Sequence, residues 1–243
     1  MTTDCLHCPL RRRQVFEPLS AAELAFMRDF KAGELVIGPG TTVLLQGSTS
    51  PQIFTALEGW GVRHQLLPDG GRQVINFVMP GDLVGLQAGL LGEMQHNVEA
   101  TTRMRLCVFS RDDLWTLFKT MPQRAYDITW LAAREEHFLG DMLATIGRRS
   151  GLARVAWGLV SYHRRVAALE MTGEDGTVPM PYRQQDLADA FGLSLVHTNK
   201  TLRRLRAHGL VTLAAGRLRI ADLNALEALA NMDPAPVSRR PLL

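Results

Sequence analysis

The chain has 243 residues, 46% hydrophobic and 21% charged, which suits a folded protein with room for two modest domains. No apolar run approaches the roughly 18 residues of a membrane helix, and the first residues, MTTDCLHCPLRRR, lack the apolar core of a signal peptide. We therefore expect a cytoplasmic protein without a membrane partner. The net charge of +3 is uneven: residues 147–220 carry 12 Lys and Arg against 5 Asp and Glu, whereas residues 17–120 carry 8 against 11, and the basic half suits a polyanion.

Residues 15–121 are predicted to form a β-rich domain. Glycine and proline clusters reverse the chain at 38–40, 68–71 and 80–82. Segments rich in β-branched and aromatic residues, such as QIFTALEG and RQVINFV, lie between these turns. Many short strands at close spacing favour a roll, barrel or sandwich.

A long helix is predicted over 122–149, where glycine is rare and proline does not recur after Pro122. Two apolar stripes run along it at helical spacing, so one face should pack on the β-rich domain and the other should pair with a second copy. The second stripe consists of Leu139, Leu143 and Ile146. We assign dimerisation to the first stripe and its heptad positions, Ile128, Leu131, Glu135, Phe138, Met142 and Thr145. The alternative is a helix buried within a monomer.

Residues 150–231 are predicted to form a winged helix-turn-helix domain. Gly151 to Glu170 is one expected helix, and 183–191 is the next. Gly192 suits the left-handed residue after a helix, and Ser194 suits the N-cap of the following helix. LVTLAAGRLRI after this helix is typical of a two-stranded wing.

The helix after Ser194 is the predicted DNA-reading element. It would bury Thr198, Leu202 and Leu205 and expose a basic face, with base contacts near its start and phosphate contacts farther along. The candidate DNA-binding residues are Arg183, Gln184, Ser194, Val196, His197, Asn199, Lys200, Arg203, Arg204 and Arg217.

Three features in this order resemble the cAMP receptor protein and fumarate-nitrate reduction regulator (Crp/Fnr) superfamily: the glycine-punctuated roll with PGDLVG at 80–85, the long helix, and YRQQDLADAFGLS followed by NKTLRRL. The resemblance implies an α+β chain with a cyclic-nucleotide-binding-like β-roll, a dimerisation helix and a C-terminal winged helix-turn-helix domain. It also implies a homodimeric transcription regulator that binds palindromic double-stranded DNA, with RNA polymerase as a further partner. Residues 1–14 then form a cysteine-containing segment, and 232–243 a flexible tail.

Cyclic-nucleotide binders of the superfamily hold the cyclic phosphate with an Arg-Ser pair. Met94 and Gln95 stand at the matching positions here and offer no guanidinium for bidentate phosphate recognition. We therefore expect that cAMP is not the effector, and that the roll holds another ligand or none.

The cysteines resemble part of an iron–sulfur site. Cys5 and Cys8 match the start of the family's N-terminal cluster and Cys107 matches its distant cysteine, but the third N-terminal cysteine is absent and Gln14 stands near its place. An iron–sulfur cluster would need a fourth ligand such as His7; a zinc site and no metal at all are the alternatives.

The reading face also departs from the oxygen-responsive members, which carry Glu, Ser and Arg where this chain has Val196, Asn199 and Lys200. Val196 suits a thymine methyl, Asn199 adenine and Lys200 guanine, so we expect an altered palindrome.

Two other functions remain to be compared with gene regulation. A ligand-binding roll that controls a protein partner would need no basic helix face. An enzyme has little support, because the sequence contains no P-loop, G-x-S-x-G or H-E-x-x-H pattern. Any switch would act through a hinge at 148–152.

Overall fold

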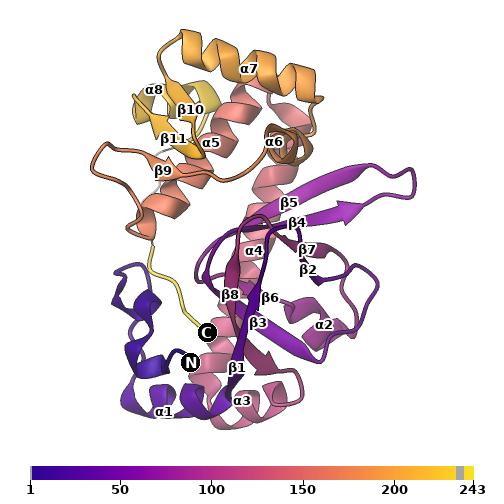
Figure 1. Ribbon diagram of the computed structural model, residues 1–243, viewed down its shortest axis with the longest axis vertical. Coiled ribbons are helices and arrows are strands. Elements are labelled where there is room, and N and C mark those ends of the chain that lie inside the picture. Colours follow the sequence, from indigo (N-terminus) through magenta and orange to yellow (C-terminus); the bar gives the residue numbers. More distant parts are fainter. Residues whose placement is uncertain (1, 234–237) are drawn as a thin grey trace. The chain divides into compact units, whose positions relative to one another are not determined.

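The computed structural model describes residues 2–233 and 238–243. It divides into two compact units (Figure 1). The first unit comprises Met1–Arg72, Asn76–His137 and Arg239–Leu243, and the second comprises Gln73–Ile75 and Phe138–Ser238. The mixture of a β-roll, a long helix and a helix-turn-helix confirms the predicted fold class.

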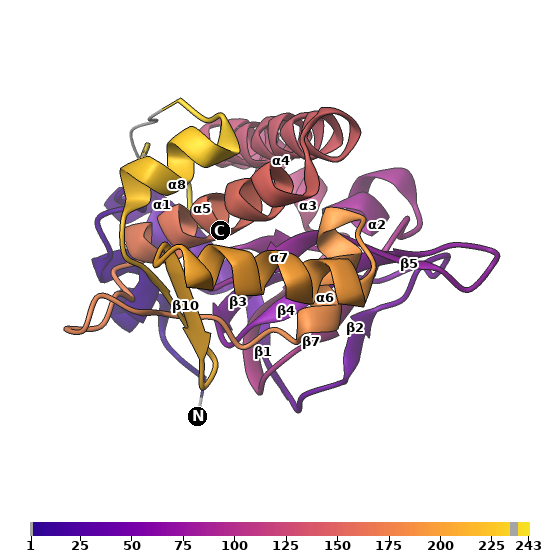
Figure 2. The ribbon, with the colours of Figure 1, turned by 90° about the horizontal axis from the view of Figure 1, so that it is seen from above.

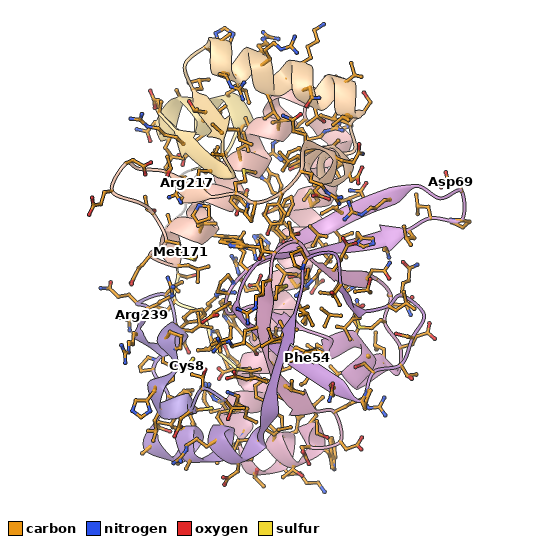
Figure 3. All side chains as sticks on the ribbon, in the orientation of Figure 1. Cys8, Phe54, Asp69, Met171, Arg217 and Arg239 are labelled. Carbon is orange, nitrogen blue, oxygen red and sulfur yellow. The ribbon has the colours of Figure 1, made fainter. Side chains whose placement is uncertain are left out.

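The first unit is built on two four-stranded antiparallel sheets. One has the order β1-β8-β3-β6, from Lys31–Ile37, Met104–Ser110, Gln52–Glu58 and Leu83–Val84. The other has the order β2-β7-β4-β5, from Thr42–Leu44, Asn97–Ala100, Gly61–Leu66 and Arg72–Val78. Asp69 marks the tip of the β4–β5 hairpin, at the predicted chain reversal over 68–71 (Figure 3). Gly59 is required between β3 and β4, because its φ is 88° and a Cβ there would overlap the Arg103 carbonyl.

Apolar side chains fill the roll, and a second apolar cluster lies beneath its helices. The roll core includes Phe54, Val98 and Leu106, each at most 3% exposed. The second cluster joins α1 (Ala21–Phe30), α3 (Leu114–Thr120) and α4 (Pro122–Arg148), and contains the stacked rings of Phe30 and Phe109. A capping box between Ser20 and Glu23 begins α1. The short helix α2 spans Leu86–Leu91.

The residues predicted for dimerisation lie on the inward side of α4. Ile128 is 2% exposed within the second apolar cluster, and Leu131 packs against that cluster. Glu135 pairs with Arg63, 2.9 Å away. Farther along α4, Phe138 stacks on Trp157, Met142 is buried, and Thr145 accepts a hydrogen bond from Arg149. Ile128, Met142 and Thr145 are buried within one chain, so the dimerisation prediction was wrong for these three residues. Leu131, Glu135 and Phe138 are half-buried, and their assignment to dimerisation stays a prediction.

The chain's two ends also have defined positions. Two short 3-10 helices, Cys5–His7 and Pro9–Arg12, lie within the predicted N-terminal segment. The predicted flexible tail was wrong at its end, because Leu242 and Leu243 are each 6% exposed in the first unit and Arg240 forms a parallel bridge with Phe16. Residues 234–237 of that tail lie outside the described part of the chain.

The second unit contains a helical core and a small sheet. Its helices are α5 (Gly151–Ala168), α6 (Gln184–Phe191), α7 (Leu195–Ala207) and α8 (Leu223–Ala230). The sheet has the order β10-β11-β9, from Val211–Ala214, Arg217–Ile220 and Val178–Pro179. From above, α7 lies over α5 and beside α6 and β10 (Figure 2). Gly158 allows α5 and α6 to pack closely, because a Cβ at this position of α5 would overlap the Phe191 ring of α6.

Candidate nucleic-acid interface

Local capping signals position the two helices of the helix-turn-helix. α6 ends at Gly192, which adopts φ 61° and ψ 40°, the left-handed region in which glycine costs little. The Ser194 hydroxyl accepts a hydrogen bond from the His197 backbone N–H at 3.2 Å and begins α7. Both predicted caps are therefore confirmed.

The inward and outward faces of α7 have different chemistry. Thr198, Leu202 and Leu205 are buried as predicted, and Thr201 is buried with them. Val196 is 78% exposed near the start of the helix. The outer face also exposes His197, Lys200, Arg203 and Arg204. It therefore presents one apolar group followed by cationic groups, as base edges and then phosphates require.

The other predicted DNA contacts are less freely presented. Arg183 is exposed but pairs with Asp186 at 3.2 Å, and Gln184 beside it is exposed. The guanidinium of Arg217 on β11 donates to the Thr177 carbonyl at 3.1 Å and to the Thr177 hydroxyl, so it is tied to the preceding loop (Figure 3). The side chain of Asn199 is half-buried, and its Oδ1 is buried with no hydrogen-bond partner among the described residues. Asn199 must turn outward before it can pair with a base.

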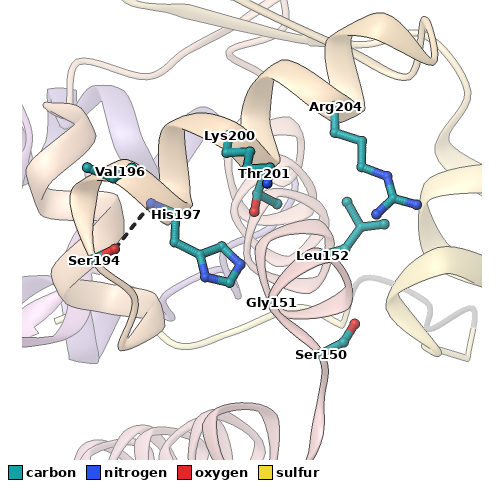
Figure 4. A pocket seen from close by; sticks show the side chains of 9 residues that line it. All are labelled: Ser150, Gly151, Leu152, Ser194, Val196, His197, Lys200, Thr201 and Arg204. Atoms are coloured by element: carbon teal, nitrogen blue, oxygen red, sulfur yellow. Dashed lines mark hydrogen bonds between the residues drawn. The ribbon is translucent and has the colours of Figure 1, made fainter.

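A groove of about 720 Å³ separates α7 from the start of α5 (Figure 4). Its lining residues are Ser150, Gly151, Leu152, Ser194, Val196, His197, Lys200, Thr201 and Arg204. The α5 N-terminus contributes the positive end of an 18-residue helix, where the Ser150 hydroxyl accepts a hydrogen bond from the Ala153 N–H. A Cβ on Gly151 would lie 2.6 Å from His197 Nε2, so glycine permits this close approach. The combination of helix N-terminus and cations is suited to phosphate.

Arg154 is a positioning residue that the sequence did not reveal. Its guanidinium donates to the Phe191 carbonyl at 2.9 Å, at the end of α6, and to the Ile146 carbonyl at 2.6 Å, near the end of α4. The last carbonyls of a helix lack partners within it, so Arg154 holds both helix ends beside the turn. A basic residue near the start of α5 was the available signal, but its partners depend on the tertiary fold.

The cysteines do not form a metal site among the residues that the structure describes, where no group of three or more His, Cys, Asp or Glu is placed to hold a metal. Cys5 Sγ instead donates to the Met27 carbonyl at 3.8 Å. Burial raises the pKa of Cys107 to about 12. As placed in the described part of the chain, these thiols do not gather into a ligand set for an iron–sulfur cluster or zinc.

The side chains at the expected ligand positions of the roll are buried or paired. Met94 is completely buried in the roll core, whereas Gln95 is exposed and donates to Glu93 at 3.0 Å. Arg63 pairs with Glu135, whose carboxylate also accepts two hydrogen bonds from Asn76 at 3.0 and 3.1 Å.

No helix in the described part of the chain has the length and hydropathy needed to cross a membrane.

Comparison with known proteins matches both halves of the chain. Residues 34–121 match the cyclic nucleotide-binding domain, and residues 153–229 match the Crp-like helix-turn-helix domain. The chain is 33% identical to nitrogen fixation regulation protein FixK of Bradyrhizobium diazoefficiens over 93% of each protein. It is 28% identical to transcriptional activatory protein AadR of Rhodopseudomonas palustris, over 94% of this chain and 96% of the relative. The structure of FixK2 from Bradyrhizobium japonicum shares the fold, with a TM-score of 0.74 and 22% identity over 84% of this chain and 98% of that one.

Proposed function

Because the chain belongs to the Crp/Fnr family of DNA-binding transcription regulators, we propose that it acts as a homodimer on a palindromic operator. Each copy inserts α7 into the major groove of one half-site, and the two-fold axis sets the half-sites about one helical turn apart. The observation that carries this proposal is the exposed basic face of α7, next to a groove suited to phosphate. The chain is a regulator and not an enzyme.

The contacts divide by position along α7. Val196 is suited to a thymine methyl, and Lys200 to the acceptor edge of guanine. Arg203 and Arg204 bind phosphates farther along, and the N–H groups at the start of α5 bind a phosphate on the other side of the groove. Arg219, exposed on β11, replaces the tethered Arg217 as the wing cation.

The second copy packs on the outward face of α4. This face follows the alternating three- and four-residue spacing of a coiled-coil seam, through Tyr126, Thr129, Ala133, Glu136, Gly140, Leu143 and Gly147. Tyr126 is 63% exposed and Leu143 is 74% exposed. Apart from the adjoining residues and backbone of α4 itself, no atom of the described residues lies within 4 Å of a Cβ built at Gly140 or Gly147. These small residues allow a second helix to approach closely.

The dimer works without cAMP. Met94 and Gln95 supply no cation for a cyclic phosphate, and Arg63 is already paired with Glu135. Family membership supports RNA polymerase as a further partner and the cytoplasm, where the chromosome lies, as the place of action.

The test is selection from a randomised duplex pool, followed by binding measurements over a range of salt concentrations. A palindrome should emerge, and affinity should fall steeply with salt because cations on the protein release counterions from phosphates. Lys200→Ala should lower discrimination between the selected site and a site altered at one base pair by about 1–3 kcal/mol. Arg203→Ala should weaken binding to all duplexes and reduce the salt slope by about one per half-site.

Lys119→Ala is the matched control, because Lys119 lies on α3 in the first unit and contacts Trp115. It should leave affinity and salt slope unchanged. Selection without a palindrome, or parental binding by both α7 variants, would refute the assignment. If the parent chain bound no duplex even at low salt, this result would instead support a module that acts on a protein partner.

A further inference from the structure

We propose that Arg239–Leu243 form a strap that docks non-covalently on the roll, gives the DNA-binding unit one more tether to it, and so restrains how that unit turns. Elsewhere the chain passes between the two units within α4, after His137, and at both ends of Gln73–Ile75. Removal of the strap would leave those passages as the covalent connections between the two units.

The strap pairs with the N-terminal segment through its backbone. The Arg240 N–H donates to the Val15 carbonyl at 2.8 Å, and the Arg240 carbonyl accepts from the Glu17 N–H at 2.9 Å. These bonds form the parallel bridge between Phe16 and Arg240. The strap therefore binds as a short added strand does, with its backbone hydrogen bonds satisfied by a specific partner.

The Arg240 side chain locks onto the glycine turn of the roll. Its Nη1 lies 2.8 Å from Asp82 Oδ1, its Nη2 donates to the Pro80 carbonyl at 3.2 Å, and its guanidinium lies 5.0 Å from the centre of the Phe16 ring. Asp82 is 7% exposed, so this ion pair is largely shielded from water. Gly81 has φ 88°, and a Cβ there would overlap the Phe16 ring. The turn is therefore shaped for this ring and this guanidinium.

The end of the strap is apolar and buried. Leu243 belongs to the cluster that contains Phe30, Ile53 and Ile128, so it packs with side chains from α1, β3 and α4. Arg124 of α4 donates to the Leu242 carbonyl at 3.4 Å. A cation followed two residues later by two leucines thus fills a charged site and an apolar site on the first unit.

The chain just before the strap is anchored to the second unit. The Met232 N–H donates to the Glu227 carbonyl at 3.0 Å, and the Asp233 carbonyl accepts from Arg164 at 3.4 Å. Six residue steps join Asp233 to Arg239, and a fully extended chain spans about 3.5 Å per step, or roughly 21 Å. A unit with an additional short tether has fewer accessible orientations than the same unit without it.

The experiment compares the full chain with a chain that ends at Ser238 and with Arg240→Gln, and exposed Arg239→Gln is the control. Hydrogen exchange of the Glu17 amide reports strap docking directly, because this N–H donates to Arg240. We expect exchange at Glu17 to become about tenfold faster or more in the first two variants and to stay unchanged in the control.

Restraint of the second unit is measured separately by electron–electron spin distances. Cysteines replace the exposed Thr116 on α3 and Ala228 on α8, in a background without native cysteines, and labelled chains are diluted with unlabelled ones. The distance distribution should broaden when the strap is deleted. A free pentapeptide with the strap sequence RRPLL should restore slow exchange at Glu17 but should not narrow the distribution.

Parental exchange at Glu17 in both variants would show that the strap does not dock. An unchanged distance distribution after deletion, or narrowing by the free peptide, would show that docking does not restrain the second unit. Protection at Glu17 that is lost on dilution to the monomer would assign the strap to a second copy. Each of these results would overturn the proposal.

Discussion

Leu143→Ala should dissociate the proposed homodimer while leaving the fold of each copy intact. Leu143 lies on the outward face of α4 and is 74% exposed in the single chain. It therefore contributes little to the stability of one copy, whereas a helix pairing along this seam buries it. The neighbouring Met142 has the opposite character, because it is 6% exposed and lies on the inward face.

The size of the effect follows from the surface that pairing removes from water. Complete burial of a leucine side chain stabilises by about 2 kcal/mol, so burial of the exposed three-quarters contributes about 1.5 kcal/mol in each copy. A two-fold interface contains the residue twice. The loss is therefore about 3 kcal/mol, equivalent to a roughly 100-fold increase in the dimer Kd.

Sedimentation equilibrium over a dilution series measures this Kd, and thermal unfolding measures the stability of the copies. Leu143→Ala should shift the midpoint of dissociation about 100-fold without lowering the monomer's unfolding temperature. Met142→Ala should lower that temperature, at a cost of about 2–5 kcal/mol, without a comparable shift in dissociation. If Met142→Ala dissociates the dimer and Leu143→Ala does not, our assignment of the two faces of α4 is wrong.

Three further results are expected. Gly158→Ala should destabilise the second unit by about 1–3 kcal/mol in thermal unfolding, because the added Cβ overlaps the Phe191 ring, and adding Phe191→Leu should recover part of the loss. A Gly158→Ala chain as stable as the parent would contradict this packing. Arg154→Ala should cost about 1.5–3 kcal/mol in duplex affinity or in stability of the second unit, because it leaves the Phe191 and Ile146 carbonyls without their charged donor. Equal values for variant and parent would exclude the positioning role. Burial and then the charge of Arg63 lower the pKa of His96 to about 4, so between about pH 6.5 and 4 the unfolded chain binds a proton that the folded chain does not, and the free energy of unfolding should fall across this range by at most about 3 kcal/mol. His96→Gln should flatten this pH dependence, and an unchanged pH profile would assign the dependence to other groups.

The helix-turn-helix was predictable because its signals are local. Gly192 and Ser194 act on backbone groups within a few residues of themselves, and the buried face of α7 repeats at helical spacing. The order of roll, long helix and reading helix was also available from turn residues and periodicity. Short-range preferences decide these features whatever the rest of the chain does.

The presentation of the site depended on longer-range contacts. Arg217 has the charge expected of a wing residue, but Thr177 in the loop before β9 holds its guanidinium. Asn199 lies in the expected reading helix, but its Oδ1 is buried. Sequence spacing placed these residues on the right elements without showing which polar atoms were already engaged.

The amino-acid sequence by itself determined the kinds of element, their order and the residues that begin or end the reading helix. Tertiary structure alone decided which stripe of α4 is covered, because periodicity marks two apolar faces equally and contacts such as Arg63 with Glu135 select between them. It also decided the position of the C-terminus, since the partner of Arg240 is Asp82, 158 residues earlier. Pairings over such separations are set by how the whole chain packs, and no local preference of either residue encodes them.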